Sequence, residues 1–325
     1  MTRPEVHVMT DITADGARRP WTAILVILAW GMLITFALLE ILPFVFTVAN
    51  SFKCLPAVQT YPQALIPTSP FGVSCQDETG GPRSADAVSG PITFNPTLQG
   101  YEELVGKENQ QVRFPLWLFN TTFIAVTVTI LRMAFDSLAG YALARLRFAG
   151  DRLIFFTILG TMMVPAIVLV IPRFIILKQL GMLNTYYGLI IPLTADAFGI
   201  FLMKQFFESI PVEIEEAARV DGASRFGIFF RVVLPMATPA LTALAIFSFQ
   251  GSWNDFLTPL IIVGGNSDLW TLPLGLSFLR GAYGETLRWH TFLAGSVITT
   301  LPLALVFFFF QRYFVEGISY SGLKG

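Results

Sequence analysis

The stretch SIPVEIEEAARVDGASRFGIFFRVVLPMATPAL, residues 209–241, decides how the rest of the sequence is organised. Its first half is the most polar segment between two long apolar runs. Pro211 suits the first turn of a helix, and three carboxylates follow where they meet the positive end of the helix dipole, Glu213, Glu215 and Glu216. Gly222 can adopt the left-handed conformation that ends helices. The pattern predicts a short helix from Val212 to Asp221.

This helix is too short to cross a membrane. It would measure about 15 Å at 1.5 Å per residue, roughly half of a bilayer. Ala217 and Ala218 leave little bulk on it, so the backbone of another protein can approach, and Glu216, Arg219 and Asp221 offer charges for docking. The alternative is an interfacial helix that binds lipid headgroups, but such helices are rich in Lys and Arg. A protein partner fits better.

The composition indicates a membrane protein. Of 325 residues, 54% are hydrophobic and 13% charged, against about 25% charged in a soluble domain. The net charge of -1 gives no support for nucleic-acid binding. Two cysteines and two histidines are too few for a usual zinc or haem site, so no metal site is expected.

Six apolar stretches reach the length of about 20 residues that a membrane helix needs: 22–48, 117–143, 153–177, 185–206, 236–263 and 290–313. We expect an all-α membrane protein with six transmembrane helices. Proline interrupts most of these stretches and tends to kink helices; the prolines are Pro43, Pro165, Pro172, Pro192, Pro239, Pro259 and Pro302.

The distribution of Lys and Arg predicts the orientation. With both termini in the cytoplasm, twelve Lys and Arg residues lie inside and four in short outside connections, Arg173, Lys178, Arg280 and Arg288. This orientation of a multi-pass inner-membrane protein places residues 212–222 inside, between the fourth and fifth helices. The expected divisions are a tail 1–21, a first helix 22–48, an external loop 49–116, a five-helix core 117–314 and a cytoplasmic tail 315–325.

The external loop is long and rich in Pro, Gly and Ser, and loops of this kind are usually functional or disordered. It contains both cysteines. A Cys54–Cys75 disulfide is chemically reasonable outside the membrane, and two unpaired cysteines are an equally good reading, because spacing does not give geometry.

Several motifs together resemble one family. The residues Glu216-Ala217-Ala218, Asp221-Gly222-Ala223 and Leu234-Pro235 look like the "EAA" loop of the permease subunits of bacterial ATP-binding cassette importers. The segments YALARLRFAG (141–150), GMLNTYYGLIIPL (181–193) and GSWNDFLTPLII (251–262) are similar to the maltose-type carbohydrate branch. The resemblance covers about residues 94–325, and residues 50–93 depart from it.

The resemblance implies partners. In that family the loop forms a coupling helix held by an ATPase subunit, so it implies two ATPase subunits, a second permease and an external solute-binding protein. This sequence has no G-x-x-x-x-G-K-[ST] phosphate loop. We therefore expect no enzyme activity and no cofactor in this chain, with ATP and Mg²⁺ bound by the ATPase partner.

Polar residues inside the apolar stretches are candidates for a substrate path, because charges in hydrocarbon are costly. Trp253, Asn254 and Asp255 combine an aromatic face with hydrogen-bonding groups, as sugar recognition requires. A structural role in helix packing is the favoured alternative for these three. Asp196 is a weaker candidate for the same path. Arg132 and Asp136, four residues apart on one helix face, can neutralise each other.

The leading hypothesis is the permease subunit of an ATP-driven importer for a sugar or polyol. The rival is an ion-coupled secondary transporter with four acids as a proton relay, Glu40, Asp136, Asp196 and Asp255. That class favours internal repeats, and none is visible. A membrane-embedded enzyme has little support, because no nucleophile–base cluster stands out.

Overall fold

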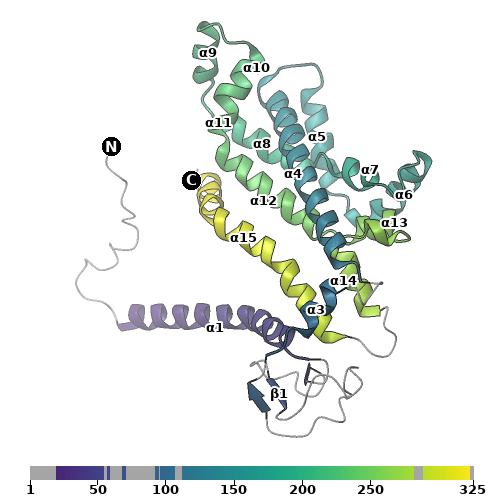
Figure 1. The fold of residues 1–325 in the computed structure, drawn as a ribbon. Helices are drawn as coiled ribbons and strands as arrows, with labels where there is room; N and C mark the ends of the chain where they lie inside the picture. The colour runs from purple at the N-terminus through teal and green to yellow at the C-terminus, as the bar shows by residue number, and fades with distance from the viewer. Residues whose placement is uncertain are drawn as a thin grey trace.

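A computed structural model describes residues 20–54, 57–58, 68–70, 92–94, 96–106, 112–281 and 288–322. The long helices are α1 (Pro20–Ser51), α4 (Phe114–Arg145), α5 (Asp151–Met162), α8 (Ala197–Ser209), α12 (Thr238–Trp253) and α15 (Trp289–Gly322). Shorter helices are α3 (Gln99–Val105), α6 (Val170–Gln179), α7 (Tyr186–Ile190), α9 (Val212–Val220), α10 (Arg225–Ile228), α11 (Leu234–Met236), α13 (Leu257–Val263) and α14 (Leu272–Gly281). Figure 1 shows α9 and α10 at one end of the molecule and α3 at the other.

Four segments of the described residues are long and apolar enough to cross a membrane without a sharp bend: Ile24–Ser51, Phe114–Arg145, Tyr186–Ser209 and Trp289–Phe310. Of these, Tyr186–Ser209 is interrupted at residues 194–196, just before α8. Two further pairs would each make one span, but both are sharply bent. Asp151–Met162 and Ala166–Gln179 meet at 98°, and Arg225–Met236 and Thr238–Trp253 meet at 79°. Pro165 and Pro239 lie at these two bends, where a helix loses a backbone hydrogen bond. The count of candidate spans is therefore four to six.

The expected fifth helix over 236–263 is wrong as a continuous helix. α12 ends at Trp253, and α13 begins only at Leu257. Between them the carboxylate of Asp255 accepts a hydrogen bond from the backbone N–H of Thr258, at 3.1 Å. A side chain that bonds a backbone N–H three residues on starts a new helix, so Asp255 separates the two elements.

α4 is the central helix of the bundle, and α8 and α12 pack along it. The approach of α8 is close at Gly140 of α4, where a Cβ would stand 2.8 Å from the Cβ of Met203. Small residues permit such contacts between membrane helices. One buried cluster fills the α9 end of the bundle, around Tyr141, Phe207 and Phe229, and a second contains Trp117, Trp253 and Leu272.

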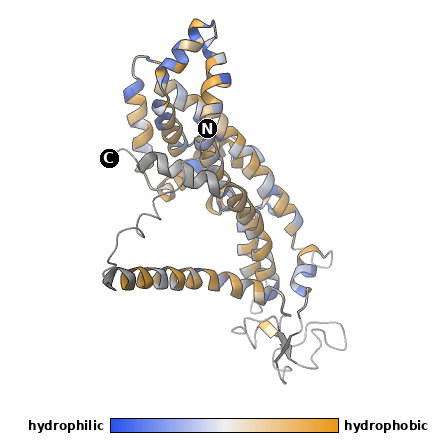
Figure 2. Cartoon of the chain, turned by 90° about the vertical axis from the view of Figure 1, so that its left-hand side faces the viewer, coloured by the Kyte–Doolittle hydropathy of each residue, from blue (hydrophilic) through white to orange (hydrophobic). Residues whose placement is uncertain are grey.

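α1 stands apart from the bundle for most of its length and is hydrophobic along that length (Figure 2). Only its last turn enters a buried region, near Ala49 and Asn50. The segment after α1 departs from the all-α expectation, because β1 (Thr68–Pro70) pairs antiparallel with β2 (Ile92–Phe94). It also contains α3, which packs against α15. α15 continues to Gly322, beyond the expected end of the core at 314.

Candidate functional site

α9 and the turn after it form the candidate docking element. The helix runs from Val212 to Val220, one residue short of the expected end at Asp221. Gly222 has a φ of 86°, its N–H donates to the carbonyl of Arg219, and the N–H of Ala223 donates to the carbonyl of Ala218. This pair of bonds is the Schellman arrangement that ends helices. The chain therefore leaves α9 through a turn that requires a left-handed residue.

The two long faces of α9 differ in exposure. Ile214 and Ala218 pack against the buried cluster at this end of the bundle, and Glu215 on the same side is 4% exposed. The opposite side presents Glu216 and Ala217 to the surroundings. Of the two small residues expected to admit a partner, Ala217 is exposed and Ala218 is partly buried.

Apolar side chains stand uncovered at the same end. Val220, in the last turn of α9, is 88% exposed, and Phe226 of α10 is 73% exposed. Val220 lies outside all candidate spans, and Phe226 lies near the start of the bent pair Arg225–Met236 and Thr238–Trp253. Sequence reasoning missed both, although an apolar residue on the polar side of a short helix is itself a signal of a contact surface.

A buried ion pair ties α9 to α4. The Nε atom of Arg145 lies 2.6 Å from Oε1 of Glu215, as a charge contact without hydrogen-bond alignment. Oε2 of Glu215 accepts a hydrogen bond from the hydroxyl of Tyr141 at 3.0 Å. The guanidinium of Arg145 also donates to the carbonyl of Ile210, just before α9. Glu215 therefore anchors α9 from inside, while its neighbours Glu216 and Ala217 stay accessible.

The chain beyond the turn links α9 to α12. Ser224 caps α10 by accepting a hydrogen bond from the N–H of Gly227. A π-helical turn, Phe229–Val233, then precedes Leu234-Pro235, and the direction changes at Ala237. Leu234 packs on the buried cluster, whereas Pro235 is exposed. A displacement of α9 would therefore be transmitted to α12 through a short, irregular helix.

The candidate substrate-path residues lie at the end of α12. Trp253 is 1% exposed, and its indole nitrogen donates to the carbonyl of Thr299 on α15. Asp255 is engaged at the start of α13, while Asn254 is exposed. The geometry favours the packing alternative for Trp253 and Asp255 and leaves Asn254 as the accessible member.

The remaining acids also make structural contacts. Asp196 caps α8 by accepting from the N–H of Gly199, and Asp136 accepts from the N–H of Asp196. Arg132 donates to the carbonyl of Leu193. Among the described residues Arg132 and Asp136 form no close ion pair, although the positive charge of Arg132 still acts on Asp136 at longer range. Both side chains instead fasten the segment before α8 to α4.

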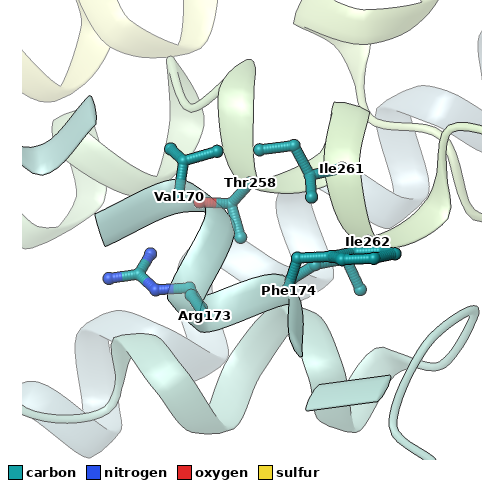
Figure 3. A pocket seen from close by; sticks show the side chains of 6 residues that line it. All are labelled: Val170, Arg173, Phe174, Thr258, Ile261 and Ile262. Atoms are coloured by element: carbon teal, nitrogen blue, oxygen red, sulfur yellow. The ribbon is translucent and has the colours of Figure 1, made fainter. Parts of the chain in front are cut away.

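Two cavities among the described helices differ in size and lining. Figure 3 shows the side chains around a cavity of about 20 Å³ between α6 and α13, lined by Val170, Arg173, Phe174, Thr258, Ile261 and Ile262. That volume is about the size of one water molecule. A recess of about 430 Å³ between α4, α12 and α15 is almost wholly apolar, with Thr129, Thr238 and Thr242 as its hydroxyl groups.

At the end opposite α9, a polar cluster fixes α3 to the start of α15. Oε2 of Glu103 lies 3.0 Å from Nε2 of His290, accepts from the hydroxyl of Thr291 at 2.7 Å and pairs with Arg288. Burial alone would raise the pKa of Glu103, but the hydrogen bonds and positive charges around it lower the pKa to about 2. Glu103 is therefore held as a carboxylate.

Neither a disulfide nor a metal site is added by the structure. Cys54 is buried, and Cys75 lies outside the described residues, so their pairing stays a prediction. Within the described ranges, no group of three His, Cys, Asp or Glu side chains is placed to hold a metal ion.

A helical bundle with four to six candidate spans, together with a short, polar, partly uncovered helix between two of them, defines a multi-pass membrane transport subunit. Residues 136–320, more than half of the chain, match the family described as binding-protein-dependent transport system inner membrane component. The chain belongs to this family.

Characterised relatives support this assignment. The chain is 39% identical over 234 residues, 72% of its length and 83% of the relative's, to the arabinooligosaccharides transport system permease protein AraQ of Halalkalibacterium halodurans. It is 34% identical over 236 residues, 72% of its length and 84% of the relative's, to the trehalose/maltose transport system permease protein MalG of Thermococcus litoralis.

A solved structure shares the fold. A crystal structure of a bacterial ABC transporter involved in the import of the polysaccharide alginate aligns with a TM-score of 0.72 and 23% identity, over 92% of this chain and 99% of the other. The chain is thus a permease subunit of a binding-protein-dependent transport system, and the ion-coupled alternative has no support among these relatives.

Proposed function

We propose that this chain is a permease subunit of an ATP-driven sugar importer, and that α9 is the helix through which ATPase subunits act on it. The substrate class is supported by relatives named for arabinooligosaccharides, trehalose/maltose and lactose. With a second permease it would form the translocation path, and an external binding protein would deliver the solute. ATP and Mg²⁺ would be bound by the ATPase subunits.

The proposal includes an orientation, with α9 and both termini in the cytoplasm. Basic side chains gather at the α9 end of α4, α5 and α8, at Arg145, Arg147, Arg152 and Lys204. Such a concentration is typical of the cytoplasmic side. α3 and the cluster around Glu103 would then lie outside.

The mechanism follows from how α9 is built into the bundle. ATP shifts an assembly only by binding one state better than another, so the docking element must be coupled to the spans. Arg145 and Tyr141 attach α9 to α4, and the turn at Gly222 leads to α12. Movement of α9 would therefore reach two helices that pack on one another. The bends near Pro165 and Pro239 are the places where spans could rearrange.

One observation carries the docking role. On a single short helix, the inner acid Glu215 is buried in an ion pair, while the next residue, Glu216, is uncovered beside Ala217 and near Val220. An interfacial lipid-binding helix would instead present Lys and Arg around an apolar face. Exposed acid, alanine and valine side chains suit a protein cleft.

The test is Glu216→Lys in the assembled transporter. We expect uptake of the solute to be lost and the ATPase subunits to be retained poorly on purification, while the chain still inserts in the membrane. Gln205→Lys is the matched control, since it adds a positive charge to an exposed position of α8 at the same end. Normal uptake by the Glu216→Lys protein would remove the docking role of α9.

A further inference from the structure

A recess at the α9 end is separate from the exposed docking residues Glu216, Ala217 and Val220, none of which lines it. It has a volume of about 610 Å³ and lies between the end of α4, the beginning of α5, the end of α8 and Val212, the first residue of α9. Four cationic and two acidic side chains line it, Arg145, Arg147, Arg152, Lys204, Asp151 and Glu208. The rest of its wall is apolar and includes Phe155 and Phe156.

The pairing of these charges leaves the recess positive. Lys204 pairs with Glu208 at 2.5 Å, and Arg145 is paired with Glu215 outside the recess. Arg147 and Arg152 form no ion pair with any residue that the structure describes, and both are exposed. Against them stands only Asp151, so one positive charge is in excess.

The first turn of α5 adds to this field. α5 is twelve residues long and begins after Gly150, which supplies no side chain to cap it. The uncapped N–H groups of a helix start favour an anion. Two of them are already satisfied, because Asp151 accepts a hydrogen bond from the N–H of Arg152 and the N–H of Asp151 donates to the carbonyl of Phe148. The recess therefore suits a ligand with a single negative charge.

Beside these charged side chains lies the exposed apolar surface of α5. No residue of α5 is buried, and Leu153 and Phe156 are 73% and 66% exposed. α5 belongs to one of the bent candidate spans, and its exposed apolar side chains are of the kind that faces lipid chains. The ring of Phe155 lies beneath the ammonium of Lys204, 4.3 Å from it, where the hydrocarbon face and the charged pocket meet.

We infer that this recess binds the phosphodiester headgroup of an anionic phospholipid such as phosphatidylglycerol, with the acyl chains along α5. Arg147 and Arg152 would contact the phosphate, because guanidinium groups match its geometry. A free phosphate ion would gain nothing from the α5 face. A protein partner would have to cover side chains at the edge of the hydrocarbon layer.

The experiment uses the purified full chain in detergent, titrated with dioctanoyl phosphatidylglycerol and followed by native mass spectrometry. We expect one retained lipid, and a loss of affinity of roughly thirtyfold for Arg147→Gln/Arg152→Gln, since each Lys or Arg near anionic lipid contributes about fivefold. The lysine double variant, Arg147→Lys/Arg152→Lys, should lose less. Dioctanoyl phosphatidylcholine, which has no net charge, should bind weakly to all proteins.

The matched control is Arg225→Gln/Arg231→Gln, which removes two exposed arginines outside the recess. An equal loss of lipid affinity in this control would show that the effect comes from general surface charge, and it would overturn the inference. Full competition by millimolar inorganic phosphate would overturn it in favour of a free anion. In the assembled transporter, loss of the ATPase subunits on purification of Arg147→Gln/Arg152→Gln, with lipid binding by the isolated chain unchanged, would assign the recess to a protein partner. None of these readouts requires transport, so failure here is distinct from failure of the proposed function.

Discussion

Gly222 is the residue whose left-handed backbone conformation forms the turn after α9. Its φ of 86° is strained for any side chain except those, such as asparagine, that tolerate the left-handed region. A Cβ at this position would meet no atom within 4 Å. Any penalty of substitution therefore comes from backbone conformation and not from crowding.

We predict a graded series at Gly222. Gly222→Asn should keep most of the uptake, Gly222→Ala should destabilise the turn by about 1 kcal/mol, and Gly222→Pro should abolish uptake because proline is fixed near φ −65°. Uptake in whole cells at matched membrane levels measures the series. Equal activity of the alanine and proline proteins would contradict a conformational role.

Arg145 and Glu215 illustrate a buried pair whose partners depend on one another. Their side chains are 10% and 5% exposed. Removing one partner of such a pair costs about 3–5 kcal/mol, because the other charge is left without compensation. Replacing both by apolar residues is often much less costly.

We predict that the effects of substituting Arg145 and Glu215 on the stability of the chain are not additive. Glu215→Leu should lower the unfolding temperature of the purified chain strongly, and Arg145→Met/Glu215→Leu should recover much of that loss. Arg225→Met, at an exposed position, should change stability by less than about 0.5 kcal/mol. Additive effects of the two single changes would show that the pair does not fasten α9 to α4.

Gly222 and Glu215 show what can and cannot be predicted from the sequence. The end of the helix at Gly222 depends only on the local sequence, which predicts it. The burial of Glu215 depends on Arg145, seventy residues earlier in the chain, and no local rule brings them together. The spacing of Ile214 and Ala218 places Glu215 on their face of the helix, which was the available signal.

At the scale of elements, α9 was predictable and the fifth span was not. The charge pattern around residues 212–222 marks both ends of a short helix. The apolar run 236–263 carries no comparable signal, because hydropathy does not register the cap that Asp255 provides. The contact of α3 with α15 was equally hidden, since it depends on Glu103 meeting side chains nearly two hundred residues away.

The α3–α15 contact should depend on pH. The pKa of Glu103 is lowered from 4.5 to about 2 in the folded chain, so the carboxylate form stabilises the fold at higher pH. That contribution is complete above pH 4.5 and is lost as the pH falls from 4.5 towards 2. Folding stability should therefore decline in this interval because the Glu103 carboxylate becomes protonated. Glu103→Gln removes this contribution, since glutamine does not titrate.

The measurement is the unfolding temperature of the full chain between pH 6 and pH 2.5. The wild-type chain should exceed Glu103→Gln at pH 6, and the difference should shrink as the pH falls below 4.5. Glu102→Gln, at the exposed neighbouring position, should follow the wild-type curve. A constant difference between wild type and Glu103→Gln would contradict the prediction.

At the scale of the whole molecule, three of the four acids of the proton-relay hypothesis make separate structural contacts, and the fourth is exposed. Asp136 and Asp196 hold the beginning of α8, Asp255 starts α13, and Glu40 is exposed on α1. A relay needs titratable groups that pass a proton from one to the next. The arrangement instead suits a subunit whose energy arrives through a docking helix.

The last prediction concerns the source of that energy in the assembled transporter, reconstituted in vesicles. Collapse of the proton gradient with an ionophore at constant ATP should leave uptake unchanged, whereas removal of ATP with the gradient intact should stop it. Asp255→Asn should keep most of the uptake, because asparagine also caps helices, while an ion relay through this carboxylate would lose it. Uptake that followed the gradient and failed in the asparagine protein would return the ion-coupled mechanism to first place.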